Sequence, residues 1–350
     1  MNKHWLSIHI FYSSKANPFI VDCLAPLIDL LRKRGLIRRY FFIKYWMEGP
    51  HVRLRLLLAE GVEEEEVKRV IEPVIAEYLQ RRPALYDLDS EQFRAFHKDM
   101  FIAEYGKETW VEKYGEDGEM PLRANNSFHY IEYEPEYLRY GGVEGVELAE
   151  WHFEKSSDIV IRLLRDTNVP VRTIMLGLST QLSLPLCFGF LEDDQRVIDF
   201  LINYLKYWQE TFHKESLNLH ADFDKKYDKM AVELQRRIAE VRRYIVDNTP
   251  GSLTTIEREW AAHIRELRAR IDALVLEEKL IFQGKGEDGE AIGPITRLDY
   301  VYYQVLLSGY IHMTNNRLGV SILDEIYLSY ILKRTLEERI LHAEVQEVLI

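Results

Sequence analysis

The feature that most constrains the fold of this chain is a change of hydrophobic period near Val146. Before Val146, residues 5–12, 39–46 and 51–58 are short runs rich in β-branched and aromatic residues, with the alternation typical of strands. After Val146, apolar residues recur at three- and four-residue spacing almost throughout, as in amphipathic helices. We therefore predict an α+β fold, in which an N-terminal antiparallel sheet packs against a predominantly helical remainder.

We expect one domain over residues 1–350, with a sheet-containing part at 1–145 and a helical part at 146–350. The first part opens in the order strand, helix, strand, strand, helix. Its second and third strands are joined by Met47-Glu48-Gly49-Pro50, which has the length and chemistry of a hairpin loop.

The C-terminal part ends with two predicted helices, at 299–313 and 321–342. A loop at 314–319 is expected to separate them. A second loop, glycine-rich and acidic, is expected at 284–289.

The net charge limits which partners the chain can bind. Its 45 Lys and Arg against 57 Asp and Glu give a formal charge of −12, which argues against binding nucleic acid through general electrostatics. Any cationic site must therefore be concentrated in one place, and we predict no direct binding of nucleic acid.

The cysteines and the N-terminus bear on location and cofactors. Cys23 and Cys187 cannot form a disulfide scaffold or a zinc site of short spacing, so we expect no metal and a reducing environment. The chain opens directly into a strand pattern without a signal peptide. Polar residues interrupt the longest uncharged stretch, 174–191, which favours a buried helix over a membrane span. We predict a cytoplasmic protein without a transmembrane segment.

A strand carrying three cationic side chains is the first candidate site. In residues 51–58 the two-residue period puts His51, Arg53 and Arg55 on one face and only apolar residues on the other. A solvated sheet face would explain this pattern. The alternative is an anion between the arginines, whose planar donors suit a carboxylate or a phosphate.

Two further clusters carry candidate residues. Glu136 and Arg139 precede a Gly-Gly pair, where an ordinary turn with a salt bridge is the plainer interpretation. His312 lies late in a predicted helix, where terminal carbonyls favour its protonated form and allow proton transfer near neutral pH. A single helical histidine is nevertheless more often structural.

Taken together and in order, these motifs carry a family resemblance. The motifs are Phe41 to Trp46 with Gly49 to Arg55, then Pro135-Glu136 with Arg139 to Gly142, then His312-Met313 with Asn316 to Gly319. The chain resembles the thiopeptide-type bacteriocin biosynthesis family, which is similar to the C-terminal glutamate-elimination domain of lanthipeptide (LanB-type) dehydratases. The resemblance covers nearly the whole chain. One departure is Lys44, where an arginine is expected.

The resemblance implies a lyase that eliminates glutamate from glutamylated Ser or Thr of a ribosomally made precursor peptide, leaving dehydroalanine or dehydrobutyrine. It implies no cofactor. The arginines would surround the glutamyl group and His312 would act as base or acid. The implied catalytic residues are His312, Arg139 and Arg55, and the implied substrate-binding residues are Arg53, His51, Glu136 and Arg317.

The implied partners are a precursor peptide with its leader, a separate glutamyl-tRNA-dependent glutamylating subunit and a second copy of the chain in a homodimer. Two alternatives stay open. The first is a thiopeptide pyridine synthase, which joins two dehydroalanines by a formal [4+2] cycloaddition with release of the leader. The second is a catalytically idle subunit that binds the leader by adding it to an edge strand.

Overall fold

The computed structural model describes residues 4–85, 91–168, 171–212, 219–249, 251, 253–285, 291–295 and 297–348. These residues divide into two compact units. The sheet unit comprises the described residues of Met1–Glu134, Ser156–Thr167 and Asn316–Gly319, and the helical unit comprises the others. Each unit has its own core.

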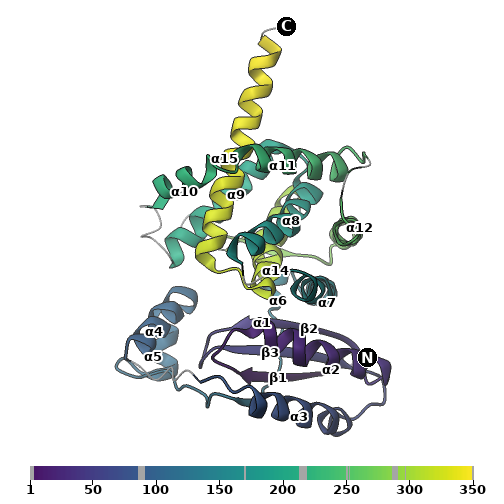
Figure 1. The fold of residues 1–350 in the computed structure, drawn as a ribbon, viewed down its shortest axis with the longest axis vertical. Helices are drawn as coiled ribbons and strands as arrows, with labels where there is room; N and C mark the ends of the chain where they lie inside the picture. The colour runs from purple at the N-terminus through teal and green to yellow at the C-terminus, as the bar shows by residue number, and fades with distance from the viewer. Residues whose placement is uncertain are drawn as a thin grey trace. The chain divides into compact units, whose positions relative to one another are not determined.

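The sheet unit is built on four antiparallel strands, β1 (Trp5–Phe11), β2 (Ile37–Tyr45), β3 (His51–Leu58) and β4 (Ser127–Tyr130), in the order β2-β3-β1-β4 (Figure 1). The crossover from β1 to β2 is formed by α1 (Ala16–Phe19), a π-helical stretch (Ile20–Leu24) and α2 (Ala25–Lys33). After β3 comes α3 (Glu64–Arg81). This β-α-β-β-α-β order with β1 between β3 and β4 is a split βαβ fold.

Two more helices, α4 (Glu91–Tyr105) and α5 (Lys107–Tyr114), are inserted between α3 and β4. They form a small core of Phe101, Trp110 and Met120, against which Trp46 and Met47 of the β2–β3 turn pack. Aromatic burial therefore fixes the insertion at the end of the sheet where β3 begins with His51.

The strand register separates the two faces of the sheet. Leu54 and Leu56 of β3 are fully buried on the apolar face, as is Ile8 of β1. On the opposite face Arg53 pairs with His9 and Arg55 with Ser7. Since paired residues of antiparallel strands project to the same side, the predicted cationic face also carries polar residues of β1.

A short C-terminal segment is anchored in the sheet unit. The side-chain amide of Asn316 accepts a hydrogen bond from Lys44 N and donates one to Lys44 O, each at 2.8 Å. Next to it, Arg317 is fully buried and its Nε donates to Ser157 Oγ at 3.2 Å. The segment thus lies against edge strand β2 and the second half of α7.

The helical unit contains most of the remaining chain. Its elements are α6 (Tyr137–Tyr140), the first part of α7 (Val143–Asp166), α8 (Arg172–Leu191), α9 (Asp194–Phe212), α10 (His220–Tyr227), α11 (Ala231–Ile245), α12 (Thr255–Leu276), β5 (Phe282–Lys285), β6 (Ala291–Ile295), α13 (Leu298–Val305), a second π-helical stretch (Leu306–Tyr310), α14 (Ile311–Leu318) and α15 (Ile322–Val348).

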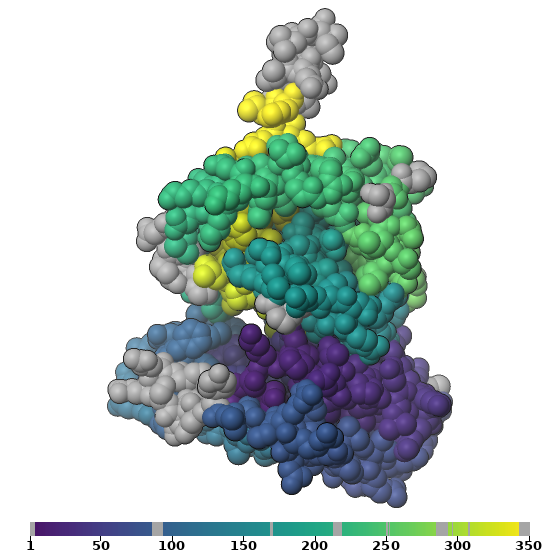
Figure 2. All heavy atoms as spheres, in the orientation of Figure 1, coloured from purple at the N-terminus to yellow at the C-terminus, as the bar shows by residue number. Residues whose placement is uncertain are grey.

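The helical unit is organised around α8, which contacts α9, α11, α12, α13 and α15. By length and composition α8 is apolar enough to cross a membrane, but 78% of its apolar window is buried inside the structure. This burial is what a core helix requires. Helix α11 lies at the surface of this unit, and α15 extends beyond the unit's other helices (Figures 1 and 2).

The predicted α+β class and its N-terminal strands are confirmed, but the predicted loop at 314–319 is wrong. Helix α14 continues to Leu318. Thr314 Oγ1 donates to Tyr310 O at 2.7 Å, and Asn315 Oδ1 accepts from Ser179 Oγ at 2.6 Å, so these two side chains are satisfied inside the fold. The helix break is instead at Gly309, whose φ is +149°.

The second predicted loop, at 284–289, is partly a strand. Gly284 and Lys285 belong to β5, which pairs with β6. Residues 286–289 lie outside the described residues.

Candidate functional site

Arg55 is a buried cation with uncharged partners. It is 5% exposed, and its Nη1 donates to Ser7 Oγ and, at 3.0 Å, to His9 Nε2. Its guanidinium carbon lies 5.1 Å from the ring centre of Tyr133. Within the described part of the chain no carboxylate forms an ion pair with Arg55. Burial and the neighbouring Arg53 charge lower the pKa of Arg55 to about 9.

Arg53 is held beside it by an aromatic ring and an imidazole. Its guanidinium carbon lies 3.6 Å from the ring centre of Tyr45, and its Nε donates to His51 Nε2 at 3.1 Å. His51 Nδ1 in turn donates to Gly49 O at 2.8 Å. The loop carbonyl therefore fixes the tautomer in which Nε2 of His51 is an acceptor.

The imidazoles of His9 and His51 are held in the neutral form. Burial, together with the charges of Arg53 and Arg55, lowers the pKa of His9 to about 2 and that of His51 to about 3. His51 stacks 5.0 Å from His9 and is only 4% exposed. The interpretation of this face as solvated is therefore wrong for His51 and Arg55. The rings of Phe11 and Tyr45 lie against His51, and that of Tyr133 lies against Arg55.

In the helical unit His312 is paired with a carboxylate. It lies near the start of α14, so the expected contact with terminal helix carbonyls is wrong. Instead His312 Nδ1 lies 2.8 Å from Glu325 Oε1, and its ring lies 4.6 Å from that of Trp208. Glu325 is 1% exposed, and its Oε2 accepts a hydrogen bond from Tyr204. Over the described ranges, His312 Nε2 makes no hydrogen bond.

Arg139 lies in the same unit as His312. Its Nη1 donates to Glu136 Oε1 at 3.3 Å, as expected for the turn. A Cβ at Gly309 would lie 3.6 Å from Arg139 Nη2 and 3.3 Å from the Tyr140 hydroxyl. Because Gly309 has no side chain, α6 approaches the chain just before His312, and the second and third motifs lie near each other.

Among the other predicted residues, His51 contacts Arg53, whereas Arg317 is interior. With no exposed surface and a bond to Ser157, Arg317 is placed to hold the sheet unit together. The functional residues that sequence reasoning missed are His9, Tyr204 and Glu325. His9 is in register with Arg53, which strand pairing reveals, but no sequence signal joins Tyr204 and Glu325 to His312.

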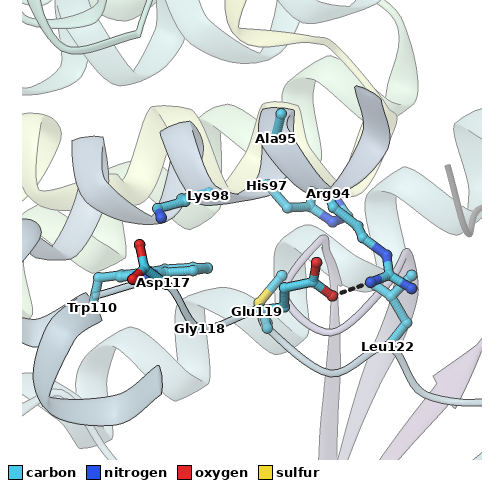
Figure 3. A pocket seen from close by; sticks show the side chains of 10 residues that line it. Arg94, Ala95, His97, Lys98, Trp110, Asp117, Gly118, Glu119 and Leu122 are labelled. Carbon is cyan, nitrogen blue, oxygen red and sulfur yellow. Dashed lines mark hydrogen bonds and ion pairs between the residues drawn. The ribbon is translucent and has the colours of Figure 1, made fainter. Parts of the chain in front are cut away.

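A cavity of about 600 Å³ lies elsewhere in the sheet unit, beside α4 (Figure 3). Arg94, His97 and Lys98 of α4 line it opposite Asp117 and Glu119, and Arg94 pairs with Glu119. The cavity carries charges of both signs and contains no residue of the three motifs. No group of three His, Cys, Asp or Glu side chains among the described residues is placed to hold a metal ion.

A split βαβ sheet with a buried guanidinium, together with a helical unit that holds a carboxylate–imidazole pair, defines an α+β protein equipped to bind an anion and to move a proton. The family described as lantibiotic biosynthesis dehydratase, C-terminal, matches residues 5–336. The chain therefore belongs to this family, and the predicted resemblance is confirmed. Membership in this family places the chain among peptide-modifying enzymes of lantibiotic biosynthesis.

Three solved structures share the fold of this chain. The pyridine synthase TbtD from thiomuracin biosynthesis has a TM-score of 0.68 and 18% identity, over 96% of this chain and 98% of that chain. TsrL has a TM-score of 0.62 and 16% identity, over 96% and 95%. The tRNA-dependent lantibiotic dehydratase MibB from Microbispora sp. 107891 has a TM-score of 0.51 and 16% identity, over 97% of this chain but 28% of that one. No sequence among the curated proteins matches.

Proposed function

We propose that this chain is a cytoplasmic lyase that eliminates glutamate from glutamylated Ser or Thr of a ribosomally made precursor peptide, giving dehydroalanine or dehydrobutyrine. The observation that carries the proposal is Arg55, a buried cation whose close partners are a hydroxyl, an imidazole and an aromatic ring. A glutamyl carboxylate would supply the counter-charge that these partners lack.

The reaction needs two kinds of groups. A base removes the Cα proton, the Cα=Cβ bond forms, the Cβ–O bond breaks and glutamate leaves as a carboxylate. We assign the binding of the glutamyl carboxylates to Arg53, Arg55 and Arg139, and the transfer of the Cα proton to His312. Glu136 orients Arg139 through their hydrogen bond, and His51 orients Arg53.

The glutamyl ester must be made before it can be eliminated. We propose that a glutamyl-tRNA-dependent partner makes it, that the leader of the precursor peptide is part of the substrate, and that two copies of the chain form a dimer. In this proposal residues 1–350 act as one elimination-type domain, whose sheet-containing and helical parts both serve the reaction.

Pyridine formation is the second candidate, favoured by the match to TbtD over 98% of that synthase. A pyridine synthase joins two dehydroalanines and has no glutamyl carboxylate to bind. The partners of Arg55 therefore favour elimination. An idle peptide-binding subunit would bind the precursor without converting it.

The test is to incubate the protein with a glutamylated precursor peptide and to follow the peptide by mass spectrometry. Loss of glutamate with formation of a dehydro residue supports the proposal. His312→Ala should lower the rate of elimination by about 10²–10⁴-fold, so that the glutamyl ester accumulates. His342→Ala, at an exposed position of the same unit, should eliminate glutamate at the parental rate. Cyclisation of a dehydroalanine peptide would favour the synthase, and no turnover of either peptide would favour the idle subunit.

A further inference from the structure

We infer that Glu325 and Tyr204 are positioning residues that hold His312 in the tautomer protonated at Nδ1, so that Nε2 is the atom that takes the proton. The role in catalysis rests on the proposed elimination. The tautomer itself does not, and it is testable in the protein alone.

The carboxylate of Glu325 is buried inside the helical unit. Its side chain is 1% exposed and, within the described residues, its hydrogen-bond partners are His312 and Tyr204. It forms no ion pair with a lysine or arginine in that part of the chain. An isolated buried carboxylate is costly, so a carboxylate kept here needs a neighbour that can become positive. His312 is that neighbour.

The hydroxyl of Tyr204 fixes the direction of the hydrogen bonds. Burial and the charge of Glu325 raise the pKa of Tyr204 well above its ordinary value, so the hydroxyl keeps its proton. Tyr204 donates this proton to Oε2, and Oε1 then accepts from Nδ1–H of His312. The ring of Trp208, 4.6 Å away, limits rotation of the imidazole. Nε2 is left with its lone pair available.

This tautomer decides between base and acid for His312. In the elimination, Nε2 takes the Cα proton, the electron pair of the C–H bond forms the double bond, and the Cβ–O pair leaves with glutamate. A carboxylate leaving group is a weak base and needs no proton. His312 is thus the base, and the Glu325 carboxylate stabilises the imidazolium that forms. The imidazolium then returns its proton to water.

The experiment compares the parent with Glu325→Gln. In that variant the Tyr204 hydroxyl donates to the amide oxygen, which turns the amide NH₂ toward His312 Nδ1 and favours the tautomer protonated at Nε2. We expect ¹⁵N NMR of the histidine rings to show this exchange of tautomers. We also expect kcat for elimination to fall by about 10²–10⁴-fold, as wrong-tautomer variants do, while KM changes by less than about threefold.

The chain offers a matched control on the same helix. Glu338 accepts a hydrogen bond from Tyr227 at 2.6 Å in α15, with no histidine in the pair. Glu338→Gln should leave both the tautomer and kcat at parental values. An equal loss of kcat in both variants, or an unchanged His312 tautomer in Glu325→Gln, would overturn the inference.

A second variant distinguishes positioning from folding. Adding Tyr204→Phe to Glu325→Gln removes the donor that fixes the amide, so the original tautomer and part of kcat should return. Failure of this rescue would count against the inference. If the parent showed the Nδ1-protonated tautomer but eliminated no glutamate, the positioning would stand and the proposed function would fail.

Discussion

In the sheet unit the buried cation Arg55 is hydrogen-bonded to the uncharged acceptors Ser7 and His9, whereas in the helical unit the buried anion Glu325 contacts an imidazole that can become a cation. The first arrangement keeps its charge uncompensated until an anion arrives, which suits binding. The second gains its counter-charge when a proton is taken up, which suits proton transfer. The two buried charges therefore suit different roles, anion binding for Arg55 and proton transfer for Glu325, because their partners differ.

The largest expected effect comes from removing the cation of the sheet unit. Arg55→Met should lower the rate of elimination at least about a hundredfold, because a contact to a developing charge is typically worth about 2.7–4 kcal/mol. The free energy of unfolding should stay within about 1 kcal/mol of the parent or rise, since losing the desolvation cost of the guanidinium offsets the loss of two hydrogen bonds. Enzyme assays and urea unfolding measure the two quantities.

Arg32 is the contrasting control for Arg55. It forms an ordinary bidentate pair with Asp158, with distances of 3.0 and 3.3 Å. Arg32→Met should therefore lower the free energy of unfolding and leave elimination at the parental rate. If Arg55→Met instead lowered the free energy of unfolding and kept the parental rate of elimination, Arg55 would be a structural residue like Arg32 and would not bind the glutamyl carboxylate.

The next effect is a pH dependence that comes from the neutral histidines of the sheet face. The folded-state pKa values of His9 and His51, about 2 and about 3, lie below the ordinary value of 6.5. As the pH falls below 6.5 the unfolded chain binds protons that the folded chain does not, so stability decreases. At pH 5 the loss is about 2 kcal/mol for each histidine.

His9→Gln tests this dependence, because a glutamine can still accept from Arg55 but does not titrate. Urea unfolding at pH 7 and pH 5 should show a smaller decrease in stability for the variant than for the parent, by about 2 kcal/mol. Equal decreases would mean that His9 is protonated in the folded protein, and the face would then be more exposed than its contacts indicate.

The smallest effect concerns the exposed ion pair of the helical unit. The side chains of Arg139 and Glu136 are 38% and 58% exposed. Such a pair contributes at most about 1 kcal/mol, so Glu136→Gln should slow elimination no more than about fivefold. If Glu136→Gln lowered the rate of elimination as much as Glu325→Gln does, burial would not determine how much each carboxylate contributes to that rate.

Much of this arrangement could be predicted from local pattern. The alternation of β3 placed His51, Arg53 and Arg55 on one face, because a strand's period of two does not depend on its neighbours. The spacing of Glu136 and Arg139 predicted their contact for a similar local reason.

The rest depends on contacts that no local pattern encodes. The polar segment around Asn315 is typical of a loop, yet it is helical because Ser179 of a distant helix satisfies its side chain. Glu325 lies in the first turn of α15, where acidic residues are common, so nothing marked it as the partner of His312. Only the packing of α9, α14 and α15 joins these residues.

The hydrogen bonds between Asn316 and Lys44 also limit which main-chain groups of the sheet edge are available to another chain. β2 is at an edge of the sheet, where free main-chain groups invite association with another strand. Asn316 occupies both the N–H and the carbonyl of Lys44, as a neighbouring strand would. One side-chain amide therefore takes the place of a neighbouring strand at this point of β2 and blocks edge-to-edge aggregation there.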